Sequence, residues 1–406
     1  MQKGGRKIKR SKSLYGNKRR RKTKSTVTLF IMIFVVGGLV FLGYSVGEPI
    51  LNFLKNGTGS SLSSEPWSPS DVTDSTSASV TEPSSSSSVS SESVSKDPGT
   101  FSAGELNEAD IQSAAALTAA LNQVKQSGYT AVTVTLKAQG GRILYKSNIE
   151  LANQASPSTS ELSAAQIAEL IHQNGLKALA RVSTLYDNLA PKANRAAGYY
   201  IEGSDSSWFD NSPQKGGKPW LNPFSETTQT YMSDFAAEIG LAGFDQVICS
   251  DVVFPPFRPT DLTYVGAAFQ DRNRSAALTH IVDIFKNRTE DTATMIGVEV
   301  SALGALQGTE EVFKPAQLQD VAAVAMFRNA DFSGTFMLNG AETDGSTLSV
   351  YDRVRTVYEA LHDMVQVQGG NMSVIPLIVT EGMSDNDRSE ALRALQELGY
   401  SAYILQ

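Results

Sequence analysis

Short apolar runs alternate with amphipathic segments from about residue 100 to the end of the chain. The apolar runs are rich in β-branched residues and predict strands at 101–106, 129–138, 176–182, 244–250, 295–301, 321–327, 374–380 and 401–405. Segments with helical spacing lie between them, at 108–127, 160–174, 226–241, 274–286, 350–367 and 388–398. Strands and helices that alternate in this way predict a parallel sheet with helices over both faces.

The number of strands favours one α/β architecture. Eight strand candidates in a segment of this length are typical of a (β/α)8 TIM barrel and less typical of a doubly wound open sheet. No glycine-rich phosphate loop of the dinucleotide-binding or Walker type follows any of the runs, which argues against nucleotide binding. We therefore predict a TIM-barrel-like domain over residues 100–406.

The beginning of the chain has a different pattern. Residues 26–46 form an uncharged apolar stretch, long enough to cross a bilayer as one helix. The basic residues ahead of it predict a cytoplasmic N-terminus by the positive-inside rule. A cleaved signal peptide is the competing interpretation, but its apolar region is usually shorter and a small-residue cleavage site would follow, which this sequence does not show.

Serine dominates the segment between the apolar stretch and the predicted barrel. Such a composition buries too little apolar surface to offset the entropy of ordering, so residues 47–99 predict a disordered linker. The predicted organisation is a basic cytoplasmic tail at 1–25, a single transmembrane helix at 26–46, this linker, and an extracellular domain at 100–406. The protein is thus expected in the cell membrane.

Charge and composition exclude several classes of function. Residues 1–25 hold twelve Lys or Arg and no acid, so the rest of the chain carries −19 although the whole carries −7. So acidic a surface does not suit nucleic acid. The single cysteine, Cys249, excludes an intrachain disulfide and a multi-cysteine metal site. The three histidines lack ligand-like spacing, so we expect no metal and no cofactor.

Polar residues at the C-terminal ends of the predicted strands are the candidates for chemistry, because a parallel barrel has its active site there. They are Lys137, Arg181, Ser250, Asp251, Glu299, Ser301 and Glu381. Asp251 and Glu299 end neighbouring strands, and paired carboxylates serve as acid and base or nucleophile in glycoside hydrolysis. Carboxylates at strand ends are also typical of helix N-caps and ion pairs, and this alternative stays open.

The connection from 182 to 221 is long and rich in aromatic residues. Tyr186, Trp208 and Trp220 lie in it together with Asp187. Aromatic faces beside carboxylates suit sugars, since the C–H faces of a pyranose pack on rings while its hydroxyls take polar partners. The alternative is that these rings only close the barrel mouth.

Several segments fit a family pattern. They are AVTVTLKAQGG (131–141), ALARVSTLYD (178–187), WLNPF (220–224), Tyr231 and GFDQVICSDVVFPPF (243–257). In these segments the chain resembles the putative glycosyl hydrolase domain family, whose members are alpha-amylase-like TIM barrels, often anchored to Gram-positive membranes. The resemblance implies a barrel that hydrolyses O-glycosyl bonds in a glycan.

The chain departs from this family at its acidic positions. Uncharged residues stand at three of them: Thr135, Ser250 and Ser301. Lys137 and Arg181 are retained. A one-residue bulge in the strand before Asp251 would bring this carboxylate to the family's position. Glu299 lies two residues before Ser301 on the same strand face and is a possible replacement there.

Two hypotheses of different classes follow. In the first, the protein is a membrane-anchored extracellular glycoside hydrolase acting on cell-wall or environmental polysaccharide, with Asp251 and Glu299 as the catalytic pair. The substrate-binding residues are then Lys137, Arg181, Tyr186, Asp187, Trp208, Trp220, Asn222 and Glu381. In the second, a catalytically degenerate barrel binds glycan or a partner protein at the cell surface. An Asp251 side chain in the mouth near another carboxylate favours hydrolysis, and one directed at the helices favours binding. A third hypothesis, a purely structural ectodomain, predicts no aromatic-lined cleft.

Overall fold

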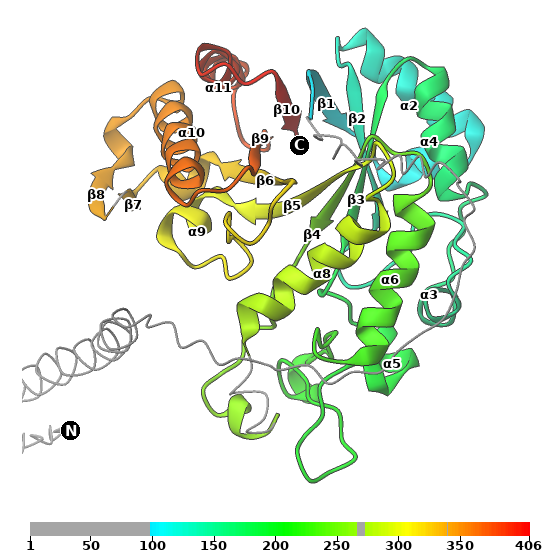
Figure 1. Ribbon diagram of the computed structural model, residues 1–406. Helices are drawn as coiled ribbons and strands as arrows, with labels where there is room; N and C mark the ends of the chain where they lie inside the picture. Colours follow the sequence, from blue (N-terminus) through cyan, green and yellow to red (C-terminus); the bar gives the residue numbers. More distant parts are fainter. Residues whose placement is uncertain (1–97, 266–272, 339) are drawn as a thin grey trace, which may run out of the picture. The chain divides into compact units, whose positions relative to one another are not determined.

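A computed structural model describes residues 98–265, 273–338 and 340–406 of the chain. Eight parallel strands close into a barrel in the order β1-β10-β9-β6-β5-β4-β3-β2 (Figure 1). The strands are β1 Phe101–Glu105, β2 Ala131–Lys137, β3 Lys177–Ser183, β4 Gln246–Ser250, β5 Met295–Ser301, β6 Val321–Arg328, β9 Ser373–Val379 and β10 Ala402–Leu405. The predicted TIM-barrel-like fold is confirmed, and each predicted strand is present.

Two layers of apolar packing hold the barrel together. Alternate residues of each strand point into the barrel, where small and branched side chains such as Ala103, Leu179 and Ile375 fill the lower interior. The other residues of each strand face the helices and join a larger core that includes Val134, Val182 and the helix residues. The two faces are both buried, which explains why the strands read as almost continuous apolar runs.

Helices follow most of the strands. The longer ones are α2 Ala114–Gln126, α4 Ala164–Gln173, α6 Glu226–Gly240, α8 Arg274–Arg288, α10 Val350–Val367 and α11 Asp385–Glu397. Every predicted helix is present, but the first begins later than predicted, because Ser113 accepts a hydrogen bond from the backbone N–H of Ala116 and caps α2.

Several short elements were not predicted. They are α3 Glu150–Ala155, α5 Ala190–Ala193, α9 Ala302–Gln307, and an antiparallel hairpin of β7 Thr335–Leu338 with β8 Ala341–Asp344. Elements of four to six residues are too short to show a helical or strand period in the sequence.

The predicted basic tail and transmembrane helix lie outside the described residues, as does almost all of the predicted linker. Within the described ranges, no helix combines the length and the apolar character needed to cross a bilayer.

The barrel mouth, at the C-terminal ends of the strands, has an uneven rim. A connection from Thr184 to Ser225 follows β3 before α6 begins, whereas only residues 106–113 separate β1 from α2. β10 and β1 lie between α11 and α2 (Figure 1). The connection after β3 is therefore much longer than the one after β1.

Candidate active site

A cavity of about 310 Å³ lies at the mouth of the barrel. Strand ends and the residues directly after them line it: Thr135, Lys137, Ala138, Gln139, Arg181, Ser183, Ser250, Asp251, Arg328 and Gln406. Three of the predicted site residues, Asp251, Arg181 and Lys137, are among them. Gln139, Arg328 and Gln406 were not predicted as site residues, although each lies at the end of a strand or within two residues after it.

Asp251 reaches the cavity through an unusual backbone conformation. The pairing of β4 with β3 is regular up to Ser250 opposite Ser183, so the bulge considered for this strand is not present in that pairing. Instead, β4 ends at Ser250 and Asp251 adopts a φ of 53°. A left-handed conformation is uncommon for a non-glycine residue and is found preferentially at functional sites.

Hydrogen bonds hold the Asp251 carboxylate at the mouth. The side-chain amide of Gln139 donates to Oδ1 at 2.8 Å, and the hydroxyl of Ser250 donates to Oδ2 at 3.4 Å. Of the two orientations considered for Asp251, the structure therefore shows the one in the barrel mouth.

Glu299 lies deeper, on the inner face of β5. Arg181 on β3 donates to its Oε1 at 2.6 Å, and the Glu299 side chain is only 10% exposed. Its Oε2 atom is buried and has no hydrogen-bond partner among the described residues. Burial raises the pKa of Glu299 above its ordinary value, although Arg181 opposes the shift, and the nearby carboxylates of Asp251 and Glu105 raise it further.

Arg181 links the acids of the mouth. Besides Glu299, it lies 3.5 Å from the Glu105 carboxylate on β1. Burial lowers the pKa of Arg181, but Glu299, Glu105 and Asp251 raise it, and the net shift is upward. Arg181 therefore stays charged, and its predicted contact with substrate stays a prediction.

Lys137 and Asp187 form an ion pair with both side chains fully buried. The Lys137 Nζ atom lies 2.9 Å from Asp187 Oδ2 and donates to the backbone carbonyl of Ser183 at 2.7 Å. Asp187 Oδ1 accepts from the backbone N–H groups of Leu189 and Ala190. The pair fixes the start of the long connection. Asp187 is not among the residues that line the cavity, so its position does not support the predicted contact with substrate, whereas that of Lys137 stays a prediction.

Trp208 also has a structural position. Its ring is 3% exposed and packs against Tyr199 and Phe257, with ring centroids 5.8 and 4.7 Å away. For this ring the structure agrees with the alternative of packing in the rim, and its predicted contact with a sugar is not supported.

Tyr186 and Trp220 form a stacked pair. Their ring centroids are 4.3 Å apart and their planes differ by 9°. Trp220 donates from Nε1 to Asp210 at 2.9 Å and is nearly buried, while Tyr186 is partly exposed. The backbone carbonyl of Tyr186 accepts from the N–H of Gly140, next to Gln139, but neither ring is among the residues that line the cavity. The predicted contact of Tyr186 and Trp220 with a sugar stays a prediction.

Two further predicted binding residues lie away from the cavity lining. Asn222 accepts from the backbone N–H of Phe224 at 3.0 Å and so stabilises the turn before α6. Glu381 is exposed in the turn after β9. Their positions do not support the predicted contact with substrate.

Gly141, in the loop that carries Gln139, is tightly enclosed. Its φ is 98°, and a Cβ atom there would lie 2.1 Å from Asp187 Oδ1. Gly141→Ala is expected to lower the free energy of unfolding by about 2–3 kcal/mol, through backbone strain and overpacking together. Gly140→Ala is the matched control, because its φ of 84° is similar but its surroundings are open. Urea unfolding of both variants measures the difference; equal losses would contradict the steric account.

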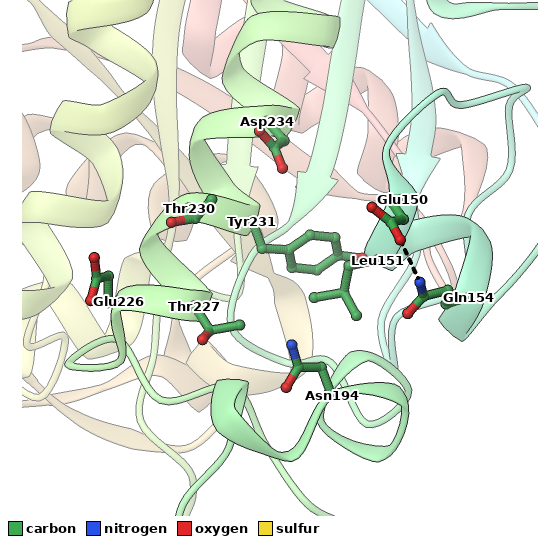
Figure 2. A pocket seen from close by; sticks show the side chains of 9 residues that line it. All are labelled: Glu150, Leu151, Gln154, Asn194, Glu226, Thr227, Thr230, Tyr231 and Asp234. Carbon is green, nitrogen blue, oxygen red and sulfur yellow. Dashed lines mark hydrogen bonds between the residues drawn. The ribbon is translucent and has the colours of Figure 1, made fainter.

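A second depression of about 450 Å³ lies outside the barrel, among α3, α6 and the end of α5 (Figure 2). Glu150, Glu226 and Asp234 bring three carboxylates to it, and burial raises the pKa of Asp234. Gln154 donates to Glu150 at 2.9 Å, as Figure 2 shows. No barrel strand contributes to its lining, so we place the candidate active site at the mouth.

Neither a metal site nor a reactive cysteine is found in the described ranges. No group of three or more His, Cys, Asp or Glu side chains is placed there to hold a metal ion. Cys249 is fully buried on β4, and burial raises the pKa of its thiol.

The chain thus combines a closed parallel barrel with Asp251 at its mouth and Glu299 deeper on β5. The chain belongs to the putative glycosyl hydrolase domain family, whose sequence model matches residues 106–317. The predicted resemblance is thus confirmed. No curated protein matches the chain significantly.

Several solved structures are similar to the chain. The glycoside hydrolase domain of PgaB (BpsB) from Bordetella bronchiseptica is 14% identical, with a TM-score of 0.50 over 76% of this chain and 93% of that one. A hypothetical protein from Ruminiclostridium thermocellum is 16% identical, with a TM-score of 0.38 over 48% and 95% of the two chains. A GH20 exo-β-N-acetylglucosaminidase from Vibrio harveyi is 11% identical, with a TM-score of 0.43 over 68% and 40%. The likeness to the PgaB domain is one of fold, because the identity is only 14%.

Proposed function

We propose that the protein is a glycoside hydrolase that cleaves O-glycosyl bonds in a cell-wall or environmental polysaccharide. One observation carries this proposal. Asp251 lies in the barrel mouth and Glu299 lies close enough to interact with it electrostatically, while burial raises the pKa of Glu299. Two carboxylates with different environments are the requirement for acid and base roles in glycoside hydrolysis.

The roles follow from the hydrogen bonds. Arg181 occupies Oε1 of Glu299, so the proton of the neutral acid belongs on Oε2, the oxygen without a partner. Glu299 would donate this proton to the glycosidic oxygen as the bond breaks. Asp251, more open and held by Gln139, would act as the base on water or as the nucleophile.

This assignment predicts a pH profile. Glu299 must be protonated to act, so kcat/KM should fall as the pH rises through the Glu299 pKa, which lies above the ordinary glutamate value. Arg181→Gln should move this limb to higher pH, because Arg181 favours the ionised form of Glu299. Profiles of kcat/KM for both proteins test the point; an unmoved limb would exclude Glu299 as the acid.

We further propose that the enzyme is anchored in the membrane by residues 26–46, with its N-terminus in the cytoplasm and the barrel outside. The uncharged apolar stretch and the basic tail before it support this orientation. Protease added to intact cells is expected to degrade the barrel and to spare a marker fused at the N-terminus. A barrel that is protected until the cells are lysed would contradict this.

Glycan binding without hydrolysis is the second candidate function. A specific observation favours it: Glu299 is held in an ion pair and is not among the residues that line the cavity. One pair of measurements separates the two functions. If the protein only binds glycan, the wild type binds oligosaccharides in a titration but releases no new reducing ends from any polysaccharide.

A further inference from the structure

The mouth cavity does not stop at the barrel rim. A further depression of about 710 Å³, distinct from the one among α3, α5 and α6, lies beside it and shares Thr135, Ala138 and Gln406 with it. Because the same three residues line both, the two depressions are neighbours, and together they are called the groove here. The groove starts at Asp251 and Arg328 and passes over the ends of β2 and β10.

The groove leaves the mouth beside the short connection between β1 and α2. Beyond the shared residues it is lined by Leu106, Asn107 and Glu108 after β1, and then by residues of α2 such as Gln123. The long connection from Thr184 to Ser225, with its stacked Tyr186–Trp220 pair, follows β3, two strands away from β1 in the barrel. A bound chain that follows the groove would therefore pass over the ends of β1 and β2 and along α2.

The charges along the groove limit what it can hold. Glu105, Glu108 and Asp110 line its outer part, and Arg142 is the one base among the lining residues there. Arg142 is already engaged, since it donates two hydrogen bonds to the Glu108 carboxylate, at 2.6 and 2.8 Å. The mouth part adds Lys137, Arg181 and Arg328 against one acid, Asp251, so acids and bases balance along the whole groove. This balance favours neither an acidic nor a basic polymer and suits an uncharged one.

We propose that the groove binds a linear, uncharged glycan along several consecutive sugar units, so that the enzyme cleaves inside the chain and not at its end. This inference rests on the proposed hydrolase function. In the cleavage, the bond from C1 to the glycosidic oxygen breaks, and that oxygen takes the proton of Glu299. A water molecule gives its hydroxyl to C1 and its proton to the carboxylate pair, which restores both groups.

The length of the ligand is the first test. Full-length Asp251→Asn protein, which avoids turnover, is titrated with β-1,4-linked N-acetylglucosamine, β-1,4-linked glucose and α-1,4-linked glucose oligosaccharides of two and six units. For the series that binds, the six-unit chain is expected to bind at least about tenfold more tightly than the two-unit chain. Equal affinity for both lengths would overturn the inference.

A variant in the outer groove is the second test. In the same Asp251→Asn background, Asn107→Trp adds bulk at an exposed position that lines only the outer part. It is expected to weaken six-unit binding about tenfold and to leave two-unit binding within about twofold. Asn211→Trp, in the exposed connection after β3, is the control and should change neither. An unchanged ratio of the two affinities in Asn107→Trp would contradict the groove.

The products separate this inference from the proposed function. Wild-type enzyme on the corresponding polysaccharide should give a mixture of oligosaccharides at the earliest times. Release of single sugars alone would overturn internal cleavage and leave the hydrolase function intact. No binding and no release with any of the glycans would overturn both.

Discussion

Asp251→Asn is expected to lower kcat/KM for glycan hydrolysis by about 10²–10⁴-fold, the usual contribution of a positioned acid or base. The amide keeps the shape of the side chain and a hydrogen bond with Gln139, but it can neither take a proton from water nor attack C1. Reducing-end release from the polysaccharide measures the effect. Glu381→Gln is the control, because Glu381 is exposed and outside the cavity lining, and its rate should be unchanged.

Glu299→Gln is expected to cause a loss of similar size, with one difference. A substrate whose leaving group needs no proton, such as a nitrophenyl glycoside, should be cleaved almost as well by Glu299→Gln as by the wild type, because only acid catalysis is removed. Asp251→Asn should be impaired with both substrates. Equal impairment of Glu299→Gln with both substrates would remove Glu299 from the role of acid.

Lys137→Met is expected to give the largest loss of stability, about 3–5 kcal/mol, because it leaves Asp187 as an uncompensated buried charge. Both side chains of the pair are fully buried, and the rings of Tyr231 and Phe235 lie about 6 Å from Lys137 Nζ. Urea unfolding of the variant and the wild type measures the difference in the free energy of unfolding.

A second substitution tests the cause of this loss. Lys137→Met with Asp187→Asn should recover much of the stability, since asparagine keeps the Oδ1 acceptor for Leu189 and Ala190 without the charge. Arg355→Met is the surface control, because its ion pair with Glu359 is exposed on both sides and contributes little. A Lys137→Met variant as stable as Arg355→Met would refute the importance of the buried pair.

The barrel could be predicted from the sequence because its strands and helices differ strongly in pattern. Both faces of each strand are buried, which gives short runs of apolar residues, and the helices between them carry charged outer faces. The hairpin of β7 and β8 and helix α9 could not be predicted, because they are only four to six residues long.

The orientation of individual site residues depends on register, which the sequence does not reveal. Thr135 pairs with Arg181, but the pairing then shifts, so that Lys137 lies opposite Val182. Side chains alternate along a strand, and a shift of one residue turns the following side chain to the other face. Lys137 therefore faces α6 and Asp187, although uninterrupted alternation from Thr135 would have placed it inside the barrel. A bulge was considered before Asp251, but the register shift that the structure shows is in β2.

The sequence also could not show which aromatic side chains are buried. Trp208 packs against Phe257, about fifty residues further along the chain and in the connection after another strand. Which ring of an aromatic-rich loop is covered and which is partly exposed depends on such long-range contacts. The carboxylates were easier to predict, because a position at a strand end of a parallel barrel already places a residue at the mouth.

The most direct measurement is a crystal structure of the full-length Asp251→Asn protein with the oligosaccharide that it binds most tightly. The account predicts sugar units at the barrel mouth, with a glycosidic oxygen facing Glu299 and the remaining units following the groove toward Asn107. Sugar bound only in the 450 Å³ depression among α3, α5 and α6, with the mouth unoccupied, would contradict the account.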